Sequence, residues 1–151
     1  MSDNIFDPEK IAFVEYKMLK GQVDTPENFT TEEVVGHGLE NSVQFGFNVE
    51  EKMAKSDFIF SIKTNSNGKN ESEAIGSFHF VFIFNIENLN ELAVPNKDGG
   101  LELHPALVNA LASITYSTSR GILLTRLQGT AFSNFILPVI NPTQLINFNK
   151  S

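Results

Sequence analysis

The sequence predicts an α+β domain in which the strands come first and the helices come last. Up to about residue 86, apolar residues alternate with polar ones, and after a break at residues 95–100 they recur at helical spacing. Strands followed by helices are typical of α+β domains. The clearest alternation is a run of four phenylalanines, which period-2 spacing places on one face of one strand. These residues are Phe78, Phe80, Phe82 and Phe84.

Four segments are expected to be strands. Residues 11–19 alternate loosely, and a short helix fits them almost as well. Residues 42–53, 57–64 and 74–86 alternate more clearly, and each of them carries phenylalanines at every second position. The connections between these last three strands are short, so the neighbours must be antiparallel. Residues 21–40 are polar, contain a proline and several glycines, and are predicted to be a long crossover connection.

A long helix is expected to begin at Pro105, because proline is tolerated in the first helical turn. Leucine and isoleucine at helical spacing carry it to Gln128, and Gly129 is a typical C-terminal glycine. Residues 131–141 form an irregular apolar segment, and residues 142–148 are predicted to be a short last helix.

Composition limits the possible functions. A chain of 151 residues corresponds to one domain, here residues 1–151, and it has no cysteine for a disulfide or a thiolate site. Its net charge of −7 disfavours nucleic acid and anionic membranes as partners. The charge suits a cationic protein partner, or it serves only to keep the protein in solution. The start lacks the features of a signal peptide and no apolar run can span a bilayer, so we expect a cytoplasmic protein without membrane insertion.

Residue patterns of known catalytic sites are missing. His37, His79 and His104 are scattered without the spacing of metal ligands. The serines do not form a nucleophile elbow, and no glycine-rich loop could hold phosphate groups. We therefore expect no catalytic residue, no metal and no cofactor.

The C-terminal third contains three distinctive motifs, which are Tyr116-Ser117-Thr118-Ser119-Arg120, Gly129-Thr130-Ala131-Phe132 and Leu137-Pro138-Val139-Ile140-Asn141-Pro142. In this order and spacing, they resemble the SecB family of export chaperones. That family has a tyrosine and an arginine close together in its long helix, a Gly-Thr-Phe-like break, and a similar lead-in to its last helix. The order of elements matches over residues 10–148, and the residues themselves match over about 105–145.

The resemblance implies a four-stranded antiparallel sheet with one long and one short C-terminal helix packed on one side. It also implies a chaperone, assembled as a dimer of dimers, that binds unfolded polypeptides in hydrophobic grooves. The groove walls would come from the crossover connection and from the loop between the helices. In this chain the corresponding peptide-binding residues are Val23, Phe29, Val34, Val35, Phe132, Phe135, Ile136 and Leu137. Among these we expect Phe135 to line the groove and Phe132 to lie in the core.

Several alternatives stay open at this point. SecB-like proteins either deliver cargo to the SecA motor or serve the antitoxin of a toxin–antitoxin pair, and both partners are candidates here. A second possible function, of a different class, is that of a small-ligand-binding or enzymatic α+β domain in which the phenylalanine face surrounds a pocket. A third possibility is that this face is entirely core or oligomer interface, which would make the protein a structural subunit. Small residues in the long helix, Ser113, Ser117 and Thr118, together with an over-apolar sheet, favour a symmetric dimer or tetramer.

Overall fold

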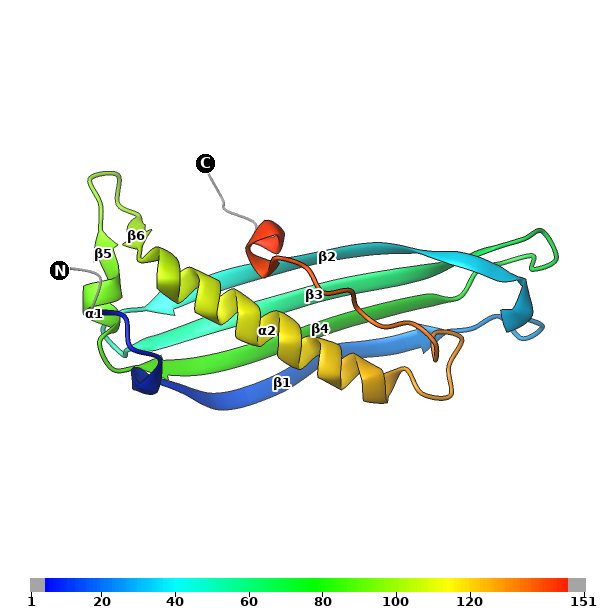
Figure 1. Cartoon of the computed structure of the whole chain (residues 1–151), viewed down its shortest axis with the longest axis horizontal. Helices are drawn as coiled ribbons and strands as arrows, with labels where there is room; N and C mark the ends of the chain where they lie inside the picture. The colour runs from blue at the N-terminus through cyan, green and yellow to red at the C-terminus, as the bar shows by residue number, and fades with distance from the viewer. Residues whose placement is uncertain (1–4, 147–151) are drawn as a thin grey trace.

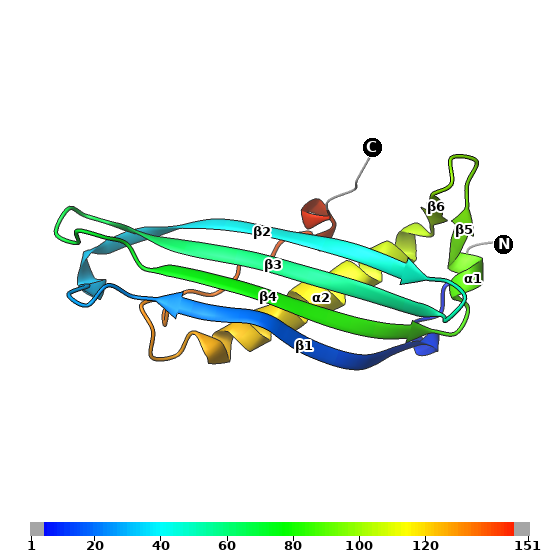
Figure 2. The ribbon, with the colours of Figure 1, turned by 180° about the vertical axis from the view of Figure 1, so that it is seen from behind.

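A computed structural model describes residues 5–146 of the protein (Figure 1). Its centre is one four-stranded antiparallel sheet with the strand order β1-β4-β3-β2. The strands are β1 (Ile11–Asp24), β2 (Val34–Asn48), β3 (Met53–Ser66) and β4 (Ile75–Ile86). A long helix, α2 (Pro105–Arg126), crosses one face of the sheet, and no helix within residues 5–146 covers the opposite face, which is turned to the viewer in Figure 2.

The smaller elements lie around this two-layer core. A short helix and a two-stranded hairpin join β4 to α2 at one end of the molecule (Figure 1). They are α1 (Leu89–Leu92), β5 (Ala93–Pro95) and β6 (Leu101–Leu103). Three single 3-10 turns span Pro8–Lys10, Thr31–Glu33 and Pro142–Leu145. The predicted α+β order is therefore confirmed, with helix α2 following the sheet.

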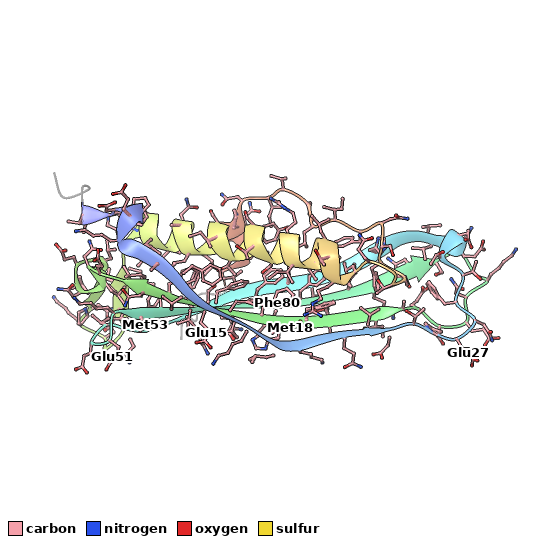
Figure 3. The ribbon with its side chains drawn as sticks, turned by 90° about the horizontal axis from the view of Figure 1, so that it is seen from below. Glu15, Met18, Glu27, Glu51, Met53 and Phe80 are labelled. Atoms are coloured by element: carbon pink, nitrogen blue, oxygen red, sulfur yellow. The ribbon has the colours of Figure 1, made fainter. Side chains whose placement is uncertain are left out.

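The phenylalanine face of the sheet is covered by the chain's own helix. All four alternating phenylalanines of β4 are buried, and Phe80 lies between α2 and the sheet (Figure 3). On β3, Phe58 pairs with Phe80 and stacks on it, with ring centroids 6.3 Å apart. A fully buried phenylalanine contributes about 1.5–3 kcal/mol, so each of these side chains stabilises the core substantially. The face is thus filled by core packing.

Helix α2 has the predicted start and nearly the predicted end. It begins at Pro105, and the Nδ1 atom of His104 accepts a hydrogen bond from the N–H of Ala106 at 3.1 Å. It ends at Arg126, two residues before the predicted end, and Gly129 has a positive φ of 76°. Part of its small, polar centre faces the sheet, because the hydroxyls of Ser56 and Thr115 share a buried 2.7 Å hydrogen bond.

The predicted crossover of residues 21–40 is wrong at both ends. Strand β1 continues to Asp24, and β2 already begins at Val34, so only nine residues join them. Glycines and polar residues occupy outward positions there, for example Gly38 opposite Lys63, and they hide the alternation. β2 also ends at Asn48 and β3 starts at Met53, both earlier than predicted.

The last helix predicted at residues 142–148 is a 3-10 turn at Pro142–Leu145, and residues 147 and 148 lie outside the described part. The irregular segment before it, residues 131–141, is here called the strap. It runs back along α2 on the same side of the sheet (Figure 1). The hydroxyl of Tyr116 donates a 2.7 Å hydrogen bond to the carbonyl of Pro138, which fastens the strap to α2. Arg120 lies over the Tyr116 ring, 5.9 Å from its centroid.

Candidate peptide-binding surface

The structure divides the eight sequence-predicted site residues by burial. Phe132 and Leu137 are buried, with 0% and 2% of their surface exposed. Val35 and Ile136 are exposed, at 71% and 61%. The other four are half-buried: Val23, Phe29, Val34 and Phe135. In a single copy of the chain, a bound partner could therefore contact only the exposed and half-buried residues of this set.

Phe132 packs against the sheet over Gly76. A Cβ atom added to Gly76 would lie 3.5 Å from the Phe132 ring and 2.9 Å from Cγ2 of Ile62. The Phe78 ring lies 3.3 Å from the same position, and on the neighbouring strand Val23 pairs with Gly76. Gly76 therefore lets Ile62 and Phe78 close in on the backbone, and the Phe132 ring packs over this position at van der Waals distance.

An aromatic cluster joins the strap to β2. The ring centroid of His37 lies 5.3 Å from that of Phe135 and 5.9 Å from that of Phe132. Phe135 also stacks on Phe60 of β3 at 6.1 Å. Burial lowers the pKa of His37 below its usual 6.5, so the imidazole is neutral at pH 7 and suits aromatic neighbours. Sequence reasoning gave His37 no role, because it stood among glycines in a predicted crossover.

The cluster brings exposed aliphatic residues to one end of the sheet. Val35 lies two residues before His37, and Ile136 directly follows Phe135, so the His37–Phe135 contact holds these two segments together. Val35 is also the extra residue of a β-bulge, which leaves its side chain 71% exposed. Farther along the strap, Val139 is 87% exposed.

The strand that carries Val35 and His37 is also an open edge of the sheet. β2 is the last strand of the sheet, and within residues 5–146 its outer edge carries a single bridge, in which Val43 pairs with Ile146 in parallel. Such an edge offers unpaired N–H and C=O groups to another extended chain. A strand edge beside exposed aliphatic side chains can bind an extended apolar peptide.

Comparison with known proteins identifies the fold of the chain by its similarity to a solved structure. No family model matches the sequence, and no curated protein matches it significantly. A solved structure of the SecB-like chaperone of Mycobacterium tuberculosis, in complex with a ChAD peptide from the HigA1 antitoxin, has a similar architecture. The two chains are 12% identical with a TM-score of 0.61, and the alignment covers 87% of this chain and 91% of that one. The chain has a SecB-like fold. The expectation drawn from the C-terminal third is confirmed at the level of architecture.

The outer face of the SecB-like sheet carries charges of both signs. Nε2 of His79 lies 2.6 Å from a carboxylate oxygen of Asp57, and Nζ of Lys55 lies 3.5 Å from the other oxygen. Within residues 5–146, no group of three or more histidines or acids could hold a metal ion. No helix in the same range is long and apolar enough to cross a membrane.

Proposed function

We propose that this protein is a chaperone that binds an extended, apolar segment of a non-native polypeptide. The segment lies along the free edge of β2 and contacts Val35, Ile136 and Val139. The observation that carries the proposal is an open β2 edge on a SecB-like fold whose β2 and strap both expose large aliphatic side chains. Main-chain pairing with β2 holds the segment, and each captured side chain adds about 1–2 kcal/mol after ordering costs.

An antitoxin segment is the client that we favour, in a dedicated toxin–antitoxin role. The structural neighbour with the same fold is a chaperone bound to an antitoxin peptide, and this supports such a client. Delivery to SecA has less support, because Asp57 on the outer face is paired with Lys55 and contacts His79, so it does not form an acidic cluster. The mechanism is passive binding in the cytoplasm, with no chemical step and no nucleotide.

We also propose that the chain works as a homo-oligomer, a dimer of dimers. The opposite edge of the sheet, β1, exposes several large apolar residues, and β1 has a free outer edge within the described range. These residues are Phe13, Val14, Tyr16 and Leu19. A shallow groove runs between Tyr16 and the side of α2 that carries Thr118, Gly121 and Ile122. Such an over-apolar edge supports association with a second copy.

The client site is tested by binding of a permanently unfolded probe, a reduced and carboxymethylated protein carrying a fluorescent label. The double variant Val35→Asp, Ile136→Asp places two charges on the site and should weaken the binding at least tenfold. Val94→Asp is the matched control, because Val94 is 47% exposed on β5 at the opposite end of the molecule (Figure 1). It should bind like the unmodified protein.

Three outcomes would count against the proposal. Equal binding by the double variant would move the site elsewhere. Equal losses in both variants would point to a general charge effect. An unmodified protein that binds neither this probe nor synthetic antitoxin-like peptides would not be a chaperone of the proposed kind.

A further inference from the structure

A polar clamp holds the connection between β1 and β2, residues 25–33, against the hairpin between β3 and β4. The side-chain Oδ1 of Asn70 accepts a hydrogen bond from the N–H of Thr30 at 2.8 Å. Its Nδ2 donates to the carbonyl of Thr30 at 3.0 Å. A single side chain thus pairs with both backbone groups of one residue, as a neighbouring strand would do.

Asn70 is itself held in place from the hairpin. Its Nδ2 also donates to Oγ of Ser66 at 2.9 Å, and this hydroxyl donates to a carboxylate oxygen of Glu73 at 2.6 Å. Glu73 accepts two more hydrogen bonds, from the N–H of Ser66 at 2.9 Å and from Oγ1 of Thr64 at 2.7 Å. Hydrogen bonds to a carboxylate are about twice as strong as neutral ones, so Glu73 fixes the geometry from which Asn70 reaches Thr30.

Little apolar packing joins these two loops directly. A cavity of about 300 Å³ lies between residues 26–29 of the connection and residues 69–72 of the hairpin. Phe29 lines this cavity and also packs against the core. The only other direct hydrogen bond described between the two segments runs from the N–H of Asn67 to the carbonyl of Glu33 at 2.8 Å. Asn70 thus makes two of the three hydrogen bonds described between the two segments, and it holds Thr30 next to the residue that anchors the connection in the core, Phe29.

We propose that Asn70 is a positioning residue of the peptide-binding site. It does not touch the peptide. It holds the connection that carries Phe29 and leads into Val34 and Val35, so this wall of the site is ordered before a client arrives. The inference rests on the proposed function. Ordering a loop in advance removes part of the entropy cost of binding, and losing this order should weaken client binding about tenfold.

The test compares Asn70→Ala with Asn67→Ala. Asn67 belongs to the same hairpin, and within residues 5–146 its exposed side chain makes no hydrogen bond. Hydrogen exchange of the amides at residues 29–35, measured without any client, shows whether the clamp orders the connection. Affinity for the carboxymethylated probe shows whether the peptide-binding site is intact. We expect Asn70→Ala to speed exchange at Thr30 and its neighbours and to bind the probe about tenfold more weakly, while Asn67→Ala changes neither quantity.

Unchanged exchange in Asn70→Ala would overturn the clamp. Faster exchange with unchanged affinity would overturn the positioning role. If the unmodified protein binds no probe, the proposed function fails, and exchange still shows separately whether the clamp exists. Asn70→Leu has nearly the same shape but neither the acceptor nor the donors, and it serves if the alanine variant does not fold. It should exchange faster than the unmodified protein at Thr30, and protection equal to that protein's would overturn the clamp.

Discussion

Phe132 and Ile136 lie four residues apart in the strap, yet we predict opposite effects of truncating them. Phe132 is fully buried over Gly76, and Phe→Ala in such a position costs about 3–5 kcal/mol, including the cavity left behind. A loss of about 4 kcal/mol raises the unfolding equilibrium constant roughly a thousandfold. Ile136 is 61% exposed, so Ile136→Ala should change stability by less than about 0.5 kcal/mol.

Urea unfolding followed by circular dichroism measures both variants, at one fixed protomer concentration because association shifts the apparent stability. With a slope of about 2 kcal/mol per molar urea, Phe132→Ala should lower the midpoint by about 2 M. Ile136→Ala should leave the midpoint within about 0.25 M by the same slope. Probe affinity is measured without urea, where Ile136→Ala should bind several-fold more weakly because it removes a contact of the proposed site.

Two results would refute this reasoning. A loss below about 1 kcal/mol in Phe132→Ala would mean that the ring is not packed in the core. Full probe affinity in Ile136→Ala would take this side chain out of the client site, whatever its exposure. A combined loss of stability and affinity in Ile136→Ala would instead show that the strap packs there in the assembled protein.

Two further predictions concern pH and assembly. Hydrogen bonds from Ser66, and then from Thr64, hold the pKa of Glu73 below its usual 4.5, so its stabilising contribution is present above about pH 4.5 and is lost as the pH falls through the lower, folded-state value. Glu73→Gln should therefore be less stable than the unmodified protein at pH 7, and the gap should narrow on acidification; a constant gap in pH-dependent unfolding would contradict this. Light scattering at micromolar concentration should give a mass well above 16.8 kDa, and a single-chain mass would remove the proposed assembly.

The sequence predicted best where alternation was strict. The four phenylalanines of β4 and those of β3 marked strands and their buried face, and capping signals placed α2 within two residues of its observed end. Prediction failed in the first part of β2, residues 34–41, where Gly36 and Gly38 stand at outward positions and hide the alternation. The strand is formed there by pairing with β3, which local propensity does not reveal.

The candidate site could be predicted only as a set of segments. Phe132, Phe135 and Ile136 look alike in an apolar loop, and only their packing against the sheet decides which of them is buried. His37 and Asn70 act through contacts with residues about 100 and 40 positions away. Such pairings depend on the tertiary structure, and no local pattern indicates them.

The small size of the exposed apolar surface limits how a single chain can bind. Val35, Ile136 and Val139 together would give about 3–6 kcal/mol, and 4.1 kcal/mol corresponds to a Kd of only 1 mM. Tight binding then needs a second contribution. If main-chain pairing along β2 supplies it, affinity depends on one client's sequence, as expected of a dedicated antitoxin chaperone. If several protomers supply it, affinity depends on client length and on the assembled state, as expected of a general holdase. Short peptides of one sequence that bind as tightly as long unfolded chains would therefore favour the dedicated role.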